Sequence, residues 1–506
     1  MKSILDALEI NKNKNPDKIA VLCEDRELTY SELYEYSDRL ANKLRQIGLV
    51  KGNVVALMFP NIIEFVISYF AVLKAGGIVL AINVIDDVED IKFILEDSNV
   101  RCIVYWDKFK DLFENVLKRL KHRVSTVSLG GKDLKDQLSY QYSSGEMDDK
   151  YKRIVIEEND ISSILYTSGT TGSPKGAMHS HKNFVLVSKI WKELVSITPE
   201  DKFLAVLPLF HPFSQIAILN SCIWCGATLV LHPRLNIDET IQIINQNNVT
   251  LFFDVPAILR LLLNKYEQEK FEMPSVRLCV SGINSCSEKI VNRFEEVFKI
   301  PIIECYGTAE TLFIASCSRI GRERRANSVG FPIKEVEMQI VDENDSVLST
   351  NEMGEILIRG ENNMIGYINH PELTCKVFRK GWFYTGDIGM EDEDGFFYVV
   401  DKKFEVIKKG GFSVYPSEIE SVLMENEKVK EVAVIGVPDD TKIEEIKACV
   451  ILNDEITSTE GEIIEFCRSK LPFYKCPKYV QFFDSLPKSS TGKLLKKLIK
   501  DRLAKV

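Results

Sequence analysis

Apolar residues at helical spacing define the first recognisable unit of the chain. They recur at positions 33, 36, 40, 44 and 47. This spacing predicts an amphipathic helix. Thr29 or Ser31 would cap its start, and Gly48 would end it. The uninterrupted apolar run at 54–59 then predicts a buried strand.

The same helix–strand unit follows again at once. Asn61 is expected to cap a helix over 62–77, and the apolar run at 78–83 predicts the next strand. A helix over 86–97 and a strand over 102–105 come next. Strands that alternate with helices of this length predict βαβ units and a largely parallel sheet.

The alternation continues to about residue 303, after which the pattern changes. Polar residues at 130–152 predict a surface connection within it, and short alternating strands are expected from 336 to 401. Strands and helices then alternate again to the C-terminus. The predicted fold class is α/β, with a large N-terminal domain of βαβ subdomains and a small β-rich subdomain (1–401), followed by a small α+β C-terminal domain (402–506).

Composition and charge narrow the class of protein. The 506 residues are 45% hydrophobic and 27% charged, as in an ordinary globular protein. The net charge of -10 argues against binding to nucleic acid or anionic membranes. Charged residues interrupt every apolar run too early for a membrane span, so we expect a cytosolic (cytoplasmic) enzyme. Residues 470–506 carry ten lysines and arginines and only two acids. They would form a solvated face, or attract a polyanionic ligand or an acidic protein.

The cysteines indicate a reducing compartment rather than a disulfide framework. The twelve cysteines are scattered, and many lie in strand-like apolar runs. Cys222 and Cys225 form one C-x-x-C motif without a second pair or a nearby histidine. Two buried thiols are therefore expected there rather than a zinc or redox site.

The strongest chemical signal is the segment 165–181, LYTSGTTGSPKGAMHSH. An apolar strand leads into glycines and hydroxyls and then to Lys175. Glycines let backbone N–H groups approach an anion, hydroxyls add donors, and lysine adds positive charge. The segment predicts a phosphate-binding loop, although it lacks the P-loop spacing. The alternative is a flexible surface loop.

This segment resembles the phosphate-loop signature of adenylate-forming enzymes, the superfamily of acyl-CoA synthetases, peptide-synthetase adenylation domains and beetle luciferase. Further segments resemble family motifs in the family's order. They are PLFHPFS (208–214), CYGTAET (305–311), GWFYTGD (381–387), VDKKFEVIKKGGFSVYPSEIE (400–420) and PKSSTGK (487–493). The resemblance spans about residues 165–493, and the N-terminal third matches in pattern only.

The resemblance implies a two-step acid–thiol ligase. A carboxylate attacks the α-phosphate of ATP to give an acyl-adenylate and pyrophosphate, and a thiol then displaces AMP. ATP and Mg²⁺ would be the cofactors and coenzyme A the co-substrate. Lys175 and Lys493 would supply positive charge where negative charge develops. A mobile C-terminal domain would rotate between the two steps.

The resemblance also implies roles for single residues. Tyr306 would lie against adenine, Glu310 would bind magnesium together with Thr167, and Asp387 would accept hydrogen bonds from both ribose hydroxyls. The implied catalytic residues are Lys493, Glu310, Thr170 and Lys175. The implied ATP- or AMP-binding residues are Thr167, Ser168, Gly169, Thr170, Thr171, Gly172, Lys175, Gly282, Ile283, Tyr306, Gly307, Thr308, Asp387, Lys402 and Lys493.

Two further sites are implied for the acid and the thiol. The acyl pocket would be lined by Phe210, His211, Ile283 and Asn284. Ile283 would narrow it, and Asn284 and Ser285 would offer hydrogen bonds to a polar acid. His211 matches a position that gates the pocket, or is a packed turn residue. The pantetheine arm of coenzyme A would pass Lys408, Gly410, Gly411 and Phe412, where consecutive glycines allow a close approach.

Three positions depart from the family pattern. Ala309 stands where threonine is usual, and Thr308 would replace the missing hydroxyl from one position earlier. Lys402 replaces an arginine, and Phe404 stands at the hinge position. Ala309 is similar to the alanine of fatty acyl-AMP ligases, which load an acyl carrier protein. That acceptor and a catalytically silenced nucleotide-binding protein therefore remain alternatives to a fatty- or aryl-CoA synthetase.

Overall fold

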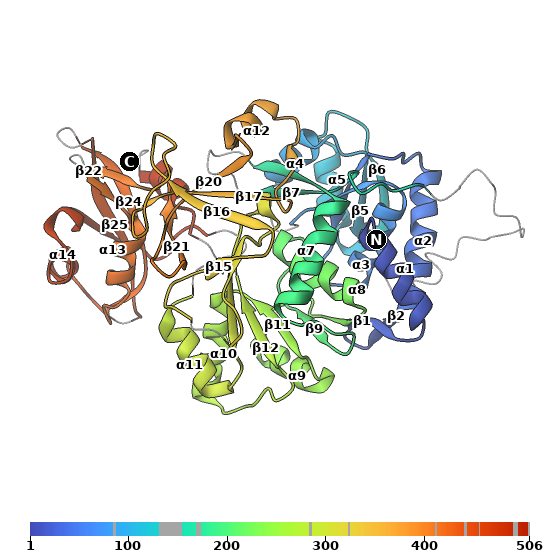
Figure 1. Cartoon of the computed structure of the whole chain (residues 1–506), viewed down its shortest axis with the longest axis horizontal. Coiled ribbons are helices and arrows are strands. Elements are labelled where there is room, and N and C mark those ends of the chain that lie inside the picture. The colour runs from blue at the N-terminus through green and yellow to red at the C-terminus, as the bar shows by residue number, and fades with distance from the viewer. Residues whose placement is uncertain are drawn as a thin grey trace, which may run out of the picture. The chain divides into compact units, whose positions relative to one another are not determined.

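The computed structural model describes residues 1–83, 88–130, 154–167, 174–282, 286–321, 324–409, 412–439, 443–454, 456–488 and 494–503. The chain divides into two compact units (Figure 1). Unit 1 comprises the described residues of 1–338 and 358–383, and unit 2 those of 339–357 and 384–506. The boundary that we predict after residue 401 stays a prediction.

Unit 1 contains a mixed sheet with a parallel centre. In the described part of the chain its strand order is β15-β14-β13-β12-β11-β9-β10-β1-β2. The strands are β1 (Ile19–Cys23), β2 (Arg26–Thr29), β9 (Lys202–Ala205), β10 (Thr228–Leu231), β11 (Leu251–Asp254), β12 (Leu278–Ser281), β13 (Ile302–Tyr306), β14 (Ser316–Cys317) and β15 (Phe331–Pro332). The six neighbouring strands β13, β12, β11, β9, β10 and β1 pair in parallel. The strands at the two ends of the sheet, β2 on one side and β14 and β15 on the other, pair in antiparallel fashion. Parallel strands end at a common edge, and here β11, β12 and β13 end next to one another.

A second sheet of unit 1 has the order β18-β8-β7-β4-β3-β5-β6 among the described residues. Its strands are β3 (Val54–Met58), β4 (Ile78–Ala81), β5 (Cys102–Trp106), β6 (Ser125–Leu129), β7 (Ile161–Thr167), β8 (Lys175–Ser180) and β18 (Gly366–Tyr367). The strands from β7 to β6 run parallel, whereas β8 and β18 are antiparallel. The predicted α/β class with largely parallel strands is confirmed.

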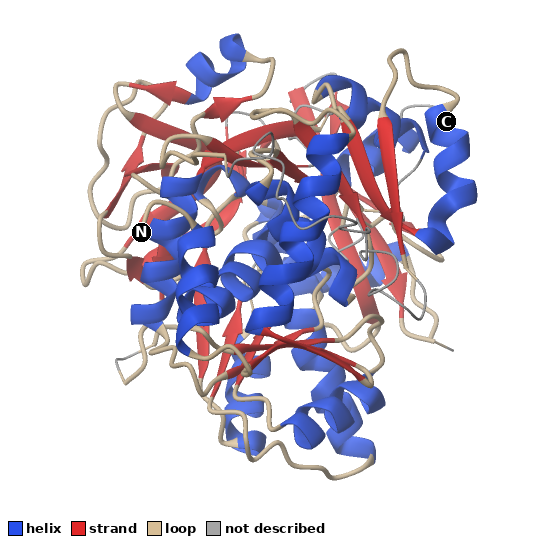
Figure 2. Cartoon of the chain, turned by 90° about the vertical axis from the view of Figure 1, so that its right-hand side faces the viewer, coloured by secondary structure: helices blue, strands red, loops and turns tan. Residues whose placement is uncertain are grey.

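Helices cover the faces of these sheets, as Figure 2 shows in blue and red. They are α1 (Ile4–Lys14), α2 (Tyr30–Gln46), α3 (Ile63–Lys74), α4 (Val88–Asp97), α5 (Lys110–Leu117), α7 (His181–Leu194), α8 (Ser221–Cys225), α9 (Ile237–Asn247), α10 (Pro256–Gln268), α11 (Glu288–Phe298) and α12 (Pro371–Val377). Every residue of α3 from Ile63 to Leu73 is buried. This burial explains its continuous apolar sequence, because α3 contacts β3 and β4 of one sheet and β1 of the other.

The first predicted helix is confirmed as α2, including its cap. The Thr29 hydroxyl accepts a hydrogen bond from the N–H of Glu32 at 3.1 Å, and the Glu32 carboxylate accepts one from the N–H of Thr29 at 3.0 Å. Such a cap contributes about 1 kcal/mol to helix stability. Gly48 follows the helix in the left-handed conformation, with φ of 97°.

Our prediction that Asn61 caps the next helix is wrong, because Ile62 is the capping residue of α3. The Asn61 amide instead donates to the carbonyls of Ala205 and Leu207, and its oxygen accepts from the N–H of Leu209. These bonds fix the chain between β9 and the predicted acyl pocket. The predicted helix over 86–97 is confirmed from Val88 onward, and 84–87 lie outside the described residues.

The β-rich subdomain is confirmed as a sheet of order β16-β17-β20-β19, with β21 on β20, in the described part of the chain. Its strands are β16 (Val336–Val341), β17 (Gly354–Gly360), β19 (Phe378–Arg379), β20 (Trp382–Glu391) and β21 (Phe397–Lys402). Of the polar stretch at 130–152, residues 131–152 lie outside the described residues.

Unit 2 also contains a sheet of order β23-β22-β25-β24, with β26 on β25, among the described residues. Its elements are β22 (Ile407–Lys409), β23 (Phe412–Val414), α13 (Pro416–Leu423), β24 (Val429–Asp439), β25 (Ile443–Leu452), α14 (Glu460–Arg468), β26 (Tyr479–Phe482) and α15 (Lys496–Leu503). Ile407, Ile419, Ile446 and Ile463 meet in its core. The predicted alternation of strands and helices is confirmed here.

The cysteines are unpaired thiols, and all except Cys375 are buried. Cys222 and Cys225 lie in α8, and burial raises the pKa of both thiols. This agrees with the predicted buried pair. No helix in the described part of the chain is long and apolar enough to cross a lipid bilayer.

Candidate active site

The predicted phosphate-binding segment joins two antiparallel strands. In their register Thr167 of β7 lies opposite Lys175 of β8, and Tyr166 lies opposite Gly176. A Cβ atom on Gly176 would lie only 2.7 Å from Ile164 and 2.8 Å from Tyr166, so the strand requires glycine there. The predicted phosphate ligands Ser168, Gly169, Thr170, Thr171 and Gly172 lie outside the described residues, as does the side chain of Thr167.

One tyrosine joins the two described catalytic candidates of unit 1. The hydroxyl of Tyr367 donates to Glu310 Oε1 at 2.6 Å. The ammonium of Lys175 lies over the ring of the same tyrosine, 5.5 Å from its centroid. Burial raises the pKa of Tyr367, so the phenol stays protonated as a donor. Lys175 and Glu310 thus both contact one neutral side chain.

The segment that carries Glu310 makes a tight turn after β13. Tyr306 ends this strand half-buried, and a Cβ atom on Gly307 would lie 2.4 Å from the backbone nitrogen of Ile314. Leu312 and Phe313 both adopt left-handed backbone conformations, with φ of 52° and 55°. Such conformations cost energy in residues other than glycine and concentrate at functional sites.

Thr308 and His179 complete this turn. The Thr308 hydroxyl is buried at the start of the short 3-10 helix Ala309–Thr311, and the Thr308 N–H donates to the Thr311 hydroxyl at 2.9 Å. Ala309 offers only its carbonyl oxygen, which lies 2.8 Å from His179 Nε2. Burial lowers the pKa of His179 to about 3, so the neutral ring donates from Nε2 to this carbonyl. His179 and Tyr367 thus both meet this turn as neutral side chains.

The described residues of the predicted acyl pocket lie together in unit 1. His211 Nδ1 accepts a hydrogen bond from the N–H of Phe213, and the His211 ring lies 5.4 Å from that of Phe313. Burial lowers the pKa of His211 to about 4, which keeps the ring neutral. Phe210 is half-buried, and its carbonyl accepts from the amide of Gln215. Ile283, Asn284 and Ser285 lie outside the described residues.

Gly282 links this pocket to the end of β11. Its N–H donates to the carbonyl of Asp254 at 3.1 Å. A Cβ atom on Gly282 would lie 3.0 Å from the Cys305 sulfur and 3.2 Å from the Phe213 ring. The backbone at this edge is thus packed directly against the aromatic side chains of the pocket.

Unit 2 brings together the predicted ribose ligand and its basic neighbour. Asp387 on β20 lies opposite Lys402 on β21, and the two side chains form an ion pair. The Asp387 carboxylate is only 3% exposed, so this ammonium compensates its charge. The Asp387 N–H donates to the hydroxyl of Thr385.

The described part of the predicted pantetheine segment lies at the surface of unit 2. The Lys408 ammonium donates to the Ser413 hydroxyl at 2.9 Å, and Phe412 stacks on Tyr474 with 4.7 Å between ring centroids. Phe412 and Phe404, the latter at the predicted hinge position, are about half exposed. Gly410, Gly411 and the predicted catalytic Lys493 lie outside the described residues.

A buried charge cluster lies at the start of α15. The ammonium of Lys496 is 2.9 Å from Glu405 and 2.9 Å from Glu420. Burial lowers the pKa of Lys496, but these two carboxylates and Asp401 outweigh it, and the net shift is upward. The cluster ties α15 to α13 and to the segment after β21.

Sequence reasoning missed Tyr367 and His179. Tyr367 lies in the two-residue strand β18, which pairs with β8 opposite Ala177. A strand this short has no periodicity, and Tyr367 is 57 residues from Glu310 in the sequence. His179 lies in the segment 165–181, but its complete burial in β8 became visible only in the structure.

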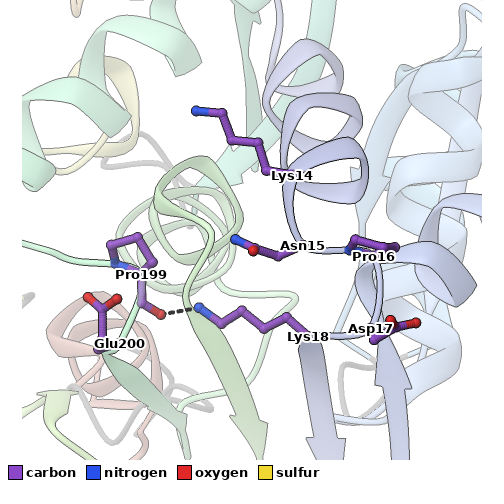
Figure 3. A pocket seen from close by; sticks show the side chains of 7 residues that line it. All are labelled: Lys14, Asn15, Pro16, Asp17, Lys18, Pro199 and Glu200. Atoms are coloured by element: carbon purple, nitrogen blue, oxygen red, sulfur yellow. Dashed lines mark hydrogen bonds between the residues drawn. The ribbon is translucent and has the colours of Figure 1, made fainter.

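A surface pocket of about 520 Å³ contains none of the predicted site residues (Figure 3). It is lined by Lys14, Asn15, Pro16, Asp17, Lys18, Pro199 and Glu200. The Lys18 ammonium donates to the carbonyls of Pro199 and Gly226, so it already holds neighbouring segments together. Burial lowers the pKa of Lys18. Lys18 therefore has a structural role in this pocket, and none of the lining residues belongs to the candidate active site.

Comparison with known families identifies the chain. The family model described as AMP-binding enzyme matches residues 8–368, and that of the AMP-binding enzyme C-terminal domain matches residues 418–493. The chain belongs to the AMP-binding enzyme family. It is therefore a member of the adenylate-forming superfamily and an AMP-forming acid–thiol ligase of the acyl-CoA synthetase type.

Relatives of this enzyme act on acids of different sizes. It is 32% identical to a long-chain-fatty-acid–CoA ligase of Bacillus subtilis, with 98% of this chain and 94% of the relative covered. It is also 32% identical to an oxalate–CoA ligase of Arabidopsis thaliana, with 97% of each covered. The structure of the anthranilate CoA ligase AuaEII with anthranoyl-AMP is 28% identical, with a TM-score of 0.89 and coverage of 99% and 98%.

Proposed function

We propose that this enzyme activates a fatty or aryl acid with ATP as acyl-AMP, releases pyrophosphate and transfers the acyl group to coenzyme A. The observation that carries the proposal is the placement of Lys175 and Glu310 on one tyrosine, Tyr367. Attack of a carboxylate on a phosphate brings two anions together, so positive charge has to be in place beforehand. Lys175 supplies one such charge, and the family resemblance assigns a second to Lys493.

Magnesium fits the donor set around Glu310. The described residues contain no group of three His, Cys, Asp or Glu side chains that would hold a metal by themselves. Mg²⁺ instead commonly keeps several waters and binds one or two carboxylates together with substrate phosphates. Glu310 offers such a carboxylate, held by the Tyr367 hydroxyl. The ion would neutralise phosphate charge, and Thr167 is the second ligand that we propose.

We take the remaining nucleotide contacts from the family resemblance, residue by residue. We assign adenine to the face of Tyr306, a phosphate oxygen to the Thr308 hydroxyl, and the ribose hydroxyls to Asp387. Thr308 would then supply the hydroxyl that Ala309 lacks. For the second step we retain Lys408, Gly410, Gly411 and Phe412 as the pantetheine contacts, with the domain boundary after residue 401.

An acyl carrier protein is the alternative acceptor. Ala309, which has no hydroxyl, and the basic segment 470–506 favour it, since carrier proteins are acidic. A silenced homologue is less favoured, because Lys402 keeps a charge next to Asp387. Acid-dependent pyrophosphate release would exclude the silenced protein.

The test is pyrophosphate release with ATP and Mg²⁺ for short, long, aromatic and amino acids, each with and without coenzyme A. We expect turnover only with one class of acid, and multiple turnovers only when coenzyme A is present. Lys493→Ala should suppress acyl-AMP formation by about 10³-fold while ATP binding persists, as for a contact made in the transition state. Acyl-AMP that forms but does not react with coenzyme A would indicate the carrier protein. ATP binding without any acid-dependent release would contradict the proposal.

A further inference from the structure

Asp97, the last residue of α4, joins three segments of unit 1. Its Oδ2 accepts a hydrogen bond from the Tyr166 hydroxyl at 2.5 Å, and its Oδ1 lies 3.2 Å from His370 Nε2. Because an ionised carboxylate only accepts hydrogen bonds, this histidine nitrogen is the donor. The backbone carbonyl of Asp97 accepts from the side-chain amide of Asn369. One residue thus holds the end of β7 and the segment directly after β18.

Both segments that Asp97 holds lie beside residues of the candidate active site. Tyr166 is the second-last residue of β7, the strand that leads into the predicted phosphate-binding segment. His370 follows Tyr367 by three residues, and Tyr367 donates its hydroxyl hydrogen bond to Glu310. Asp97 therefore fixes the chain just before one part of the site and just after another.

The two held segments also meet on the backbone that carries Lys175. A Cβ atom on the next residue, Gly176, would lie 2.8 Å from the ring of Tyr166 and 2.9 Å from Ile368. The N–H of Ile368 donates to the carbonyl of Gly176 at 2.9 Å. Since close-packed groups transmit strain, a shift of Tyr166 or Ile368 shifts the backbone next to Lys175.

Packing alone does not hold the segment after β18. Ile368 and Asn369 line a cavity of about 240 Å³, together with Ile164 and Met178 among others. On this side the two residues meet empty space, where atoms lose their van der Waals contacts. Asn369 also has a left-handed backbone, with φ of 56°, which costs energy in a residue other than glycine. The hydrogen bonds to Asp97 compensate for both.

The contact between Asp97 and Tyr166 is shielded from water. The Asp97 side chain is only 12% exposed, and Tyr166 is half-buried. Burial raises the pKa of Tyr166, and the hydrogen-bonded carboxylate raises it further, so the phenol remains a donor. A hydrogen bond to an ionised acceptor is shorter and stronger than one between neutral groups.

We propose that Asp97 is a positioning residue of this ligase, which holds β7 and the segment after β18 so that Lys175 and Tyr367 are correctly placed for ATP. This inference rests on the proposed function and adds a residue that acts through its neighbours, Tyr166 and Ile368. Without Asp97, the Lys175 ammonium is displaced from the phosphate charge that it would meet. A misplacement of about 1 Å can cost about 100-fold in rate.

The test removes the Asp97 carboxylate and measures catalysis and binding separately. In Asp97→Ala we expect kcat/KM for ATP in acid-dependent pyrophosphate release to fall about 10- to 100-fold. The Kd for ATP without Mg²⁺, from calorimetry, should rise about tenfold. Asp97→Asn should lose less, because the amide keeps an acceptor for Tyr166 and a donor for His370. Glu96→Ala is the matched control on the same helix, since Glu96 pairs with Lys121. It should leave both quantities unchanged.

Thermal unfolding identifies variants that fail to fold. If Asp97→Ala is one of them, Tyr166→Phe replaces it, because it keeps the ring on Gly176 and removes only the hydroxyl. This variant should lower kcat/KM for ATP about fivefold. Normal kinetic constants and a normal ATP Kd in the folded variants, or an equal loss in Glu96→Ala, would overturn the inference and leave the proposed function intact. Wild-type enzyme that binds ATP but releases no pyrophosphate with any acid would overturn the proposed function and this inference with it.

Discussion

The carboxylates of the two units are held in opposite ways. In unit 1, Glu310 accepts its described hydrogen bond from the neutral hydroxyl of Tyr367, and the nearby His179 is also neutral. In unit 2, Asp387 forms an ion pair with Lys402. A carboxylate held by a neutral donor keeps its full charge for a cation. A carboxylate that already has an ammonium partner is compensated, and it offers a ligand hydrogen bonds rather than net charge.

Removing the charge of Glu310, for which the described residues form no ion pair, should have the largest effect. Glu310→Gln keeps the size of the side chain and an oxygen for Tyr367, but loses the charge that attracts Mg²⁺. We expect acid-dependent pyrophosphate release to fall by about 10²- to 10³-fold. Titration with Mg²⁺ at fixed ATP should show a higher requirement. Glu361→Gln, which removes an exposed carboxylate of the same unit paired with Lys182, is the control. Equal loss in both variants would contradict the assignment.

The compensated carboxylate of unit 2 should matter less for chemistry and more for ATP binding. Asp387→Asn keeps one acceptor but loses charge-assisted hydrogen bonds worth about 1.5–3 kcal/mol, so we expect KM for ATP to rise by about 10- to 100-fold. Steady-state kinetics with saturating acid measures this. Asp454→Asn, an exposed acid of unit 2 paired with Lys430, should leave KM unchanged. A normal KM in Asp387→Asn would mean that this carboxylate only positions Lys402.

The smallest effect is expected from the neutral partner itself. Tyr367→Phe keeps the ring under Lys175 and removes only the hydroxyl that orients Glu310. We expect the Mg²⁺ requirement to rise about tenfold, the size of effect that losing a supporting hydrogen bond to a metal ligand produces. The measurement is the Mg²⁺ concentration for half-maximal pyrophosphate release. Tyr266→Phe, in an aromatic cluster of α10, serves as the control. An unchanged Mg²⁺ requirement would show that the hydroxyl has no part in holding Glu310.

Local sequence patterns correctly predicted those helices and strands whose stabilising contacts lie within one short segment. The helix α2 was predictable because its apolar face and its cap at Thr29 lie within one segment. Asn61 was misassigned because its side chain binds backbone groups about 145 residues further along, which outweighs its capping preference. Patterns within one segment do not report such long-range bonds.

The sequence predicted those residues of the candidate site that lie within a single motif. Lys175, Glu310 and Asp387 stand in segments that resemble family motifs, and the chain belongs to that family. The roles of these residues stay predictions, as do those of Lys493 and the phosphate loop. The Tyr367 contact and the hydrogen bonds of Asp97 depend on strand register and on contacts between segments far apart in the chain. They could be found only from the three-dimensional structure.

Tyr367 has one more consequence, which concerns thermodynamic linkage. Its hydroxyl holds the carboxylate expected to meet Mg²⁺, and its ring lies below the ammonium expected to meet phosphate. A ligand that reorients this side chain from one side therefore changes the affinity on the other side. Linkage requires the two effects to be equal, so Mg²⁺ and nucleotide each change the affinity for the other by the same factor.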